Sequence, residues 1–133
     1  MAALDANILV RFLVEDDSAQ LATVRRLIRR VVAAGDTLFI PVTVVVELEW
    51  VLRSNFGFAK VEVLRTMSQL LSSTELTFES EGAVEVAVMQ YQKGAADFSD
   101  CLHAALATAA GQLPLWTFDR AAAKVTGARL LST

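Results

Sequence analysis

Hydrophobic and polar positions along the chain form short apolar runs separated by longer amphipathic segments. The short runs predict strands at residues 2–4, 37–40, 75–78, 115–118 and 129–131. Between them, apolar residues recur at three- and four-residue steps, as in helices with one buried face. These segments predict helices over 7–14, 18–34, 44–54, 59–71, 80–92, 98–110 and 119–125. Strands alternating with helices predict the α/β class, as a three-layer α/β/α fold with a central parallel sheet.

Polar residues and glycines mark the expected ends of several helices. Asp17 or Ser18 is placed to cap the second helix, Thr43 is placed to cap the third, and Gly35 ends the second. No linker, internal repeat or low-complexity segment interrupts the pattern. The sequence therefore predicts a single domain over residues 1–133.

The composition is unusually apolar for a chain of this length. Hydrophobic residues make up 54% of the 133 residues, which predicts apolar surface left over for a second copy or another protein. The most apolar run, residues 38–46, is broken by Pro41 and Thr43 and is shorter than the ~18 residues that a membrane span needs. The apolar excess therefore favours a protein partner over a bilayer.

The N-terminus and the cysteine content agree with a cytoplasmic protein. Asp5 and Asn7 interrupt the start of the chain before the apolar region of a signal peptide develops. Cys101 is the lone cysteine, so no internal disulfide is expected, which fits a reducing compartment.

The net charge of −3 opposes a general nucleic-acid binder, which is usually basic. A bound cation can supply the missing positive charge locally. Four arginines at four-residue spacings share one broad face of the second predicted helix: Arg25, Arg26, Arg29 and Arg30. A solvated helix face and a contact surface for phosphates explain this pattern equally well.

Carboxylates inside or beside apolar segments are the most informative feature of the chain: Asp5, Glu47, Asp100 and Asp119. An ionised carboxylate in apolar surroundings is unfavourable unless another charge compensates it. Mg²⁺ and Mn²⁺ are hard cations that prefer oxygen ligands and can compensate several carboxylates at once. Asp5 and Asp119 each follow a predicted strand, where parallel sheets bind ligands. The pattern predicts a metal-dependent hydrolase that acts on a phosphodiester.

Ordinary structural roles compete with this interpretation for several acids. Asp119 is placed to cap the last helix, and Asp97 and Asp100 are spaced as in a capping box. His103, the only histidine, is more often structural than catalytic beside a capping acid.

Glu47 and Glu49 differ in their expected partners along the third helix. Glu49 has Arg53 four residues on, in the favourable orientation for an ion pair, and is expected to be a surface residue. Glu47 has no cation at three or four residues and is expected on an apolar face. Glu47 is therefore the better candidate for a ligand.

No Gly-rich phosphate loop, CxxC pair or serine–histidine–acid order competes with the metal hypothesis. Four stretches, read in order, resemble PIN-domain proteins: Leu-Asp-Ala-Asn-Ile-Leu-Val, Val-Val-Glu-Leu, Asp-Phe-Ser-Asp-Cys-Leu-His-Ala and Leu-Trp-Thr-Phe-Asp-Arg. With this length, the chain is similar to the VapC toxins of bacterial toxin–antitoxin pairs. The resemblance covers nearly the whole chain.

The resemblance implies roles for individual residues. It implies that the metal-binding and catalytic acids are Asp5, Glu47, Asp100 and Asp119, that Asp97 is an additional acid, and that Asn7 and Thr117 support the site. Trp116-Thr117-Phe118 departs from the family pattern, in which an asparagine often precedes the last aspartate. The resemblance further implies an Mg²⁺- or Mn²⁺-dependent ribonuclease that cleaves tRNA or rRNA, forms a homodimer and is inhibited by an antitoxin protein.

Two other classes of function remain at this point. A receiver-like signalling module also combines α/β layers with an acidic cation pocket, but its middle aspartate is replaced here by Glu47 within a helix, and Lys124 lies beyond Asp119. The second class is a PIN fold that is retained only for binding a partner protein. The complete set of acids favours the nuclease.

Overall fold

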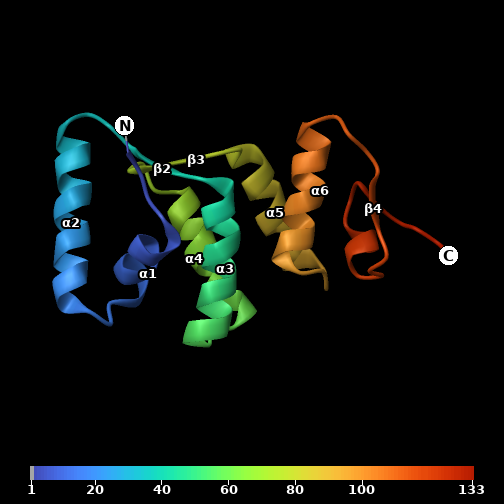
Figure 1. Cartoon of the computed structure of the whole chain (residues 1–133), viewed down its shortest axis with the longest axis horizontal. Helices are drawn as coiled ribbons and strands as arrows, with labels where there is room; N and C mark the ends of the chain where they lie inside the picture. The colour runs from blue at the N-terminus through green and yellow to red at the C-terminus, as the bar shows by residue number, and fades with distance from the viewer. Residues whose placement is uncertain (1) are drawn as a thin grey trace. The chain divides into compact units, whose positions relative to one another are not determined.

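The computed structural model describes residues 2–133 (Figure 1). They form two compact units, which divide between Glu79 and Ser80. Each unit has its own sheet and its own helices. The prediction of one domain over residues 1–133 stays a prediction.

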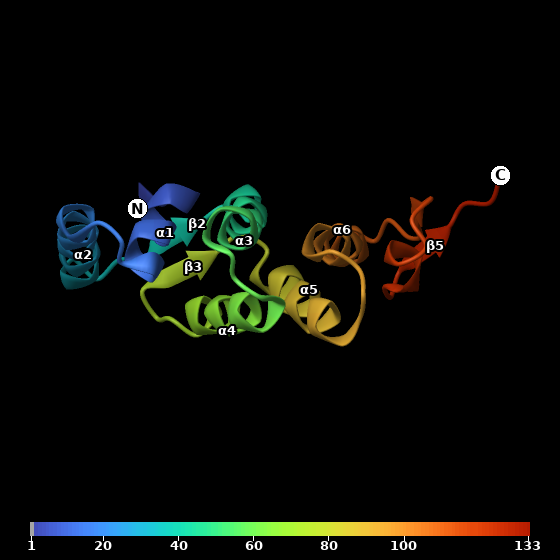
Figure 2. The ribbon, with the colours of Figure 1, turned by 90° about the horizontal axis from the view of Figure 1, so that it is seen from below.

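The N-terminal unit contains three strands and four helices: β1 (Ala2–Ala3), α1 (Ala6–Val14), α2 (Ser18–Ala33), β2 (Leu38–Ile40), α3 (Val42–Phe56), α4 (Lys60–Leu71) and β3 (Leu76–Phe78). The strands form a parallel sheet in the order β1-β2-β3, in which Ala2 pairs with Leu38 and Leu38 with Leu76. Figure 2 shows the helices ranged around these strands, with α4 next to β3.

The core of this unit combines alternate strand residues with one stripe of each helix. Leu38 and Ile40 of β2 are fully buried, as are Leu48 and Leu52 of α3. Helix α1 packs against both α2 and α3. The three- and four-residue steps of the sequence therefore correspond to the buried faces of real helices.

The helix caps of this unit follow the sequence only in part. Asp17 caps α2 as predicted, since its Oδ1 accepts the Gln20 N–H at 3.0 Å. The prediction that Thr43 caps α3 is wrong: the N-cap is Pro41, and Glu79 Oε1 accepts the Val42 N–H at 2.7 Å. A residue far along the chain thus satisfies a donor that local sequence leaves open.

The C-terminal unit contains α5 (Glu81–Lys93), α6 (Phe98–Ala109), β4 (Leu115–Thr117), the 3₁₀ turn η1 (Ala122–Lys124) and β5 (Ala128–Leu130). Helices α5 and α6 pack closely through buried alanines, including Ala87 and Ala104. The rings of Tyr91 and Phe98 meet edge to face, with centroids 5.7 Å apart. Strands β4 and β5 are parallel, with Leu115 paired to Ala128.

The predicted last helix over 119–125 is wrong, because only the turn η1 forms there. The chain must reverse within a few residues so that β5 can pair with β4, and the Leu115 N–H donates to the Gly127 carbonyl at 2.9 Å. Gly127 has a φ of +93°, a conformation that glycine adopts without steric cost. Strand pairing therefore limits the helix to one turn.

The predicted α/β class with parallel strand pairing is confirmed. Among residues 2–133, no helix is long and apolar enough to cross a membrane.

Candidate functional site

Asp100 interacts with two other aspartates of the C-terminal unit, Asp97 and Asp119. Asp97 is the N-cap of α6 and Asp100 is its third residue. The Asp100 carboxylate accepts the Asp97 N–H, which is one half of the predicted capping box. The Asp97 side chain makes no capping hydrogen bond, so the other half is missing.

Asp119 follows β4 and is held by two local hydrogen bonds. Its Oδ1 accepts the Ala122 N–H at 2.9 Å, and its own N–H donates to Thr117 Oγ1 at 3.0 Å. The helix-capping role considered from sequence is wrong, because the N-cap of η1 is Ala121 and no side chain caps that turn. The hydrogen bond from Ala122 instead fixes the orientation of the Asp119 carboxylate and engages only one of its two oxygens. Thr117 supports Asp119 directly.

The pKa of Asp100 is raised above its usual value. Burial is the largest cause, followed by the negative charges of Asp97 and Asp119, while His103 and the hydrogen bond from Asp97 act in the opposite direction. A carboxylate whose ionisation is opposed by two neighbouring carboxylates is a good ligand for a cation, because the cation removes that opposition.

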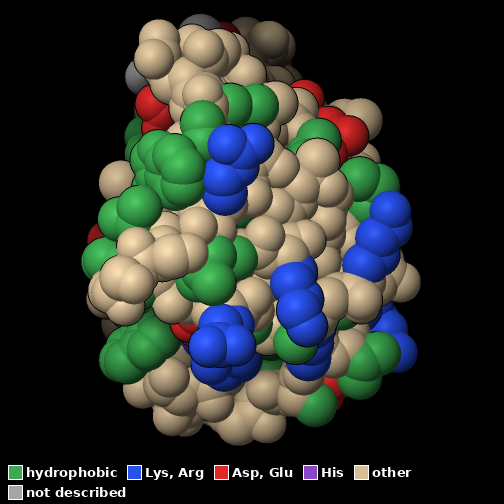
Figure 3. Space-filling model, turned by 90° about the vertical axis from the view of Figure 1, so that its right-hand side faces the viewer, with side chains coloured by type: hydrophobic (Ala, Val, Ile, Leu, Met, Phe, Trp, Pro, Cys, Tyr) green, Lys and Arg blue, Asp and Glu red, His purple; other side chains and the backbone are tan. Residues whose placement is uncertain are grey.

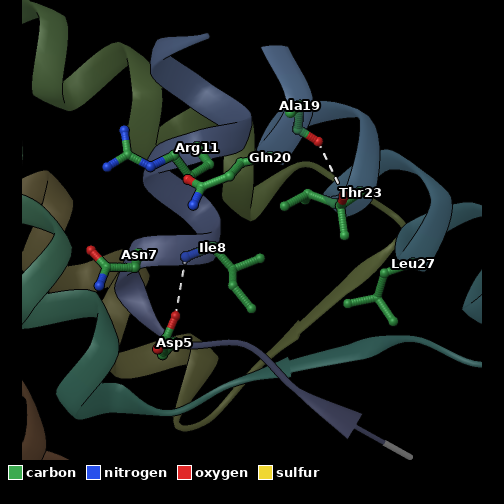
Figure 4. Close-up of a pocket in the computed structure, with 9 residues that line it drawn as sticks. Asp5, Asn7, Ile8, Arg11, Ala19, Gln20, Thr23 and Leu27 are labelled. Atoms are coloured by element: carbon green, nitrogen blue, oxygen red, sulfur yellow. Dashed lines mark hydrogen bonds between the residues drawn. The ribbon is translucent and has the colours of Figure 1, made fainter. Parts of the chain in front are cut away.

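Asp5 and Asn7 lie at the start of α1, directly after β1. Asp5 is the N-cap, and its Oδ1 accepts the Ile8 N–H at 3.1 Å. Both side chains are exposed and line a pocket between α1 and α2 (Figure 4). Asp5 is thus placed at the carboxyl end of a strand, as the sequence predicts, with one oxygen directed into a helix terminus.

The expected environments of Glu47 and Glu49 are reversed in the structure. Glu49 was expected at the surface, but it is buried, with 3% of its surface exposed, and forms an ion pair with Arg53. Glu47 was expected on an apolar face, but it is exposed. Helix α3 buries the side that carries Leu48, Glu49 and Leu52, and Glu47 points away from that side. Glu47 has no cation three or four residues away on the helix, but this does not place it on the buried face.

The remaining candidates are exposed. His103 is exposed on α6, and its charge acts on Asp100. The four arginines of α2 are also exposed, and Arg25 pairs with Glu15 at 3.5 Å. On the C-terminal unit, Trp116 and Phe118 are exposed, and the Arg129 guanidinium lies 5.7 Å from the Trp116 ring centroid. Figure 3 shows Lys and Arg side chains interspersed with hydrophobic ones on the face viewed from the C-terminal end.

The acids divide between the units: Asp5 and Glu47 belong to the N-terminal one, and Asp97, Asp100 and Asp119 belong to the C-terminal one. Over residues 2–133, no three His, Cys, Asp or Glu side chains are grouped closely enough to hold a metal ion. The donor chemistry nevertheless fits a hard cation. All five donors are carboxylates, and Asp5 and Asp119 each keep one oxygen outside their local hydrogen bonds to backbone N–H groups.

Comparison with known proteins identifies the family. The family model for the PIN domain matches residues 2–128, which span both units. The chain belongs to the PIN domain family. This PIN domain is also similar to the VapC ribonuclease of Aquifex aeolicus (strain VF5), with 23% identity over 120 residues that cover 90% of this chain and 88% of that protein. The sequence-based resemblance to PIN-domain proteins is therefore confirmed.

The sequence analysis did not assign a role to three residues of α2 or to Glu79. Gln20, Thr23 and Leu27 line the pocket beside Asp5, and their three- and four-residue spacing on α2 is the signal that could have grouped them. Glu79, which caps α3, had no such signal, because its contact is made across the sheet.

Proposed function

We propose that this PIN domain is a metal-dependent endoribonuclease that hydrolyses RNA phosphodiester bonds, and that it is the toxin of a bacterial toxin–antitoxin pair. The observation that carries the proposal is the placement of Asp97 and Asp100 at the start of α6 and of Asp119 shortly after β4, within one unit. Burial, followed by the charges of Asp97 and Asp119, raises the pKa of Asp100 there. Membership of the PIN family and the similarity to a VapC ribonuclease support the same activity.

Asp5, Glu47, Asp100 and Asp119 are the proposed catalytic acids and ligands for Mg²⁺ or Mn²⁺, with Asp97 as an additional ligand. When bound, the cation would lower the pKa of a water molecule and stabilise the leaving oxygen. This assignment follows the family resemblance residue by residue.

The chain itself prepares these side chains in several ways. The Ile8 N–H orients Asp5, and the Ala122 N–H orients Asp119. Thr117 accepts the Asp119 N–H and so holds the backbone from which that carboxylate projects. Carboxylates fixed in this way lose less rotamer entropy when they bind a ligand.

The arginines of α2 are proposed to hold the RNA backbone. They present positive charge on an otherwise acidic chain and contact phosphates without reading bases. We further propose that the substrate is tRNA or rRNA and that an antitoxin protein inhibits the domain. The protein is also proposed to form a homodimer and to be cytoplasmic. The exposed apolar side chains of the C-terminal unit, Trp116 and Phe118 among them, are consistent with a protein partner.

The test is cleavage of total bacterial RNA by the purified protein in Mn²⁺ and in Mg²⁺. EDTA and the Asp100→Asn variant serve as negative controls, and Glu85→Gln, which removes an exposed charge from α5, serves as the matched variant. Metal-dependent cleavage that persists in Glu85→Gln and is lost in Asp100→Asn supports the nuclease. Intact RNA without metal binding would favour a PIN fold that acts only through a protein partner.

A further inference from the structure

The pocket between α1 and α2 lies beside Asp5 and has a volume of about 470 Å³. Figure 4 shows Ile8 of α1 across the pocket from Thr23 and Leu27 of α2, with Asp5 at its lower edge. Pockets of this size accommodate small organic ligands. The pocket therefore offers space for a chemical group directly next to one of the proposed catalytic acids.

The pocket combines apolar walls with amide groups. Ile8 and Leu27 supply apolar surface, and Asn7 and Gln20 supply side-chain amides. Neither amide takes part in a hydrogen bond within the part of the chain that the structure describes. Each amide can both donate and accept. An unstacked nucleobase has the matching chemistry, with an apolar face and a polar edge.

Positive charge lies along one border of the pocket. Arg26 donates a hydrogen bond to Thr23 Oγ1 at 3.2 Å, and Thr23 lines the pocket. Arg30 is four residues on and lies on the same side of α2. Arg25 and Arg29 lie on the other side of the helix, where they line a separate depression with Phe12 and Glu75. The four arginines therefore form two pairs on different sides of α2, and the pair that borders the pocket is Arg26 and Arg30.

We infer that this pocket is a subsite that holds one unpaired nucleotide of the RNA next to the phosphate that is cleaved, with the base between Ile8 and Leu27. Gln20 and Asn7 contact the polar edge of the base, and Arg26 and Arg30 contact the phosphates that follow. This inference rests on the proposed ribonuclease function and adds selection of a base at the cleavage site.

A matched pair of alanines allows the subsite to be blocked. Ala19 and Ala22 are both exposed on α2, but only Ala19 lines the pocket. Ala19→Phe fills the pocket, whereas Ala22→Phe adds the same side chain on a face directed away from it. Gln20→Ala removes one amide and leaves the space open. Thermal melting by circular dichroism checks that each variant folds.

The test measures binding of short fluorescent single-stranded RNAs of U, C or A in EDTA, so that no cleavage is needed. A hydrogen-bonded base edge provides about 1–3 kcal/mol of discrimination, so the wild-type protein is expected to prefer one base by about fivefold or more. Ala19→Phe and Gln20→Ala should bring the three affinities within about twofold, whereas Ala22→Phe should retain the preference.

Equal affinities for the three RNAs in the wild-type protein, no RNA binding, or a preference unchanged by Ala19→Phe would each overturn the subsite. A base preference that is unchanged in Ala19→Phe would favour a protein segment, and not a nucleotide, as the occupant of the pocket. A base preference that is lost in Ala19→Phe, in a protein that cleaves no RNA, would instead retain the subsite and refute the nuclease.

Discussion

Asp119, which follows β4, acts through its negative charge on Asp100 in the first turn of α6, whose pKa is raised by burial, then by Asp97 and then by Asp119. The two residues are brought together because α6 and β4 pack against each other within the C-terminal unit. Burial of Asp100, together with repulsion from Asp97 and Asp119, means that folding itself opposes ionisation of Asp100. This interaction can be tested in two ways: by measuring the free energy of unfolding against pH, and by measuring stabilisation of the protein by an added cation.

The first prediction concerns stability without metal. Between the usual pKa of Asp100 and its raised value, the folded chain binds more protons than the unfolded chain. The free energy of unfolding should therefore decrease as the pH rises through this window. Asp100→Asn should reduce that dependence and be more stable than wild type at neutral pH. Urea denaturation in EDTA over a pH series measures both effects, and identical curves for Asp100→Asn and wild type would contradict the prediction.

The second prediction concerns added metal. Mn²⁺ or Mg²⁺ should raise the melting temperature, because folding brings Asp119 near Asp100, and a bound cation would offset the repulsion between them. A hundredfold excess over the dissociation constant corresponds to about 2.7 kcal/mol of stabilisation. The effect should be absent in Asp119→Asn and retained in Glu85→Gln. A melting temperature that rises equally in all three proteins would indicate binding elsewhere.

The third prediction concerns the buried charge on α3. Arg53→Met removes the ion-pair partner of Glu49, whose carboxylate stays buried. We expect a loss of about 1–3 kcal/mol in the free energy of unfolding, below the value for a fully buried pair because Arg53 is partly exposed. Arg65→Met on α4 is the control, since Arg65 is exposed. Equal denaturation midpoints for the two variants would show that the ion pair is unimportant.

The fourth prediction concerns the cap of α3. Glu79→Ala leaves the Val42 N–H without its acceptor and removes a negative charge from the helix N-terminus, which should cost about 0.5–2 kcal/mol. Glu79→Gln keeps an oxygen acceptor and should lose less. Chemical denaturation of both variants checks this order, and an equal loss in the two would assign the effect to charge alone.

The fifth prediction separates the two arginine pairs of α2. Replacing Arg26 and Arg30 with glutamine should weaken RNA binding and reduce the salt dependence by about 0.7 for each single-strand phosphate contact that is lost. The same change at Arg25 and Arg29 should have a smaller effect, because these residues lie on the far side of the helix from the pocket. Binding titrations at several salt concentrations compare the pairs, and equal slopes would show that the arginines act as one face.

The sequence by itself determined the features that depend on neighbouring residues. Apolar spacing located every strand to within a residue or two. Asp17 was one of two predicted caps of α2, with Ser18, and its partner, the Gln20 N–H, lies one turn away. Asp5 and Asp119 were recognised near strand ends because short apolar runs precede them. These features need only residues close in sequence, so the sequence can predict them unless a distant residue takes over the role, as Glu79 does at the start of α3.

Only the tertiary structure decided the features that depend on packing. Glu47 and Glu49 lie on one helix among similar apolar neighbours, and the sequence assigned the buried position to the wrong one. The side of α3 that is buried depends on which elements pack against it, and these come from distant parts of the chain. The same holds for Glu79 at the start of α3 and for the single turn that replaces the last predicted helix. In each case a long-range contact outweighs a local preference, because burial and strand pairing involve more free energy than one helical turn.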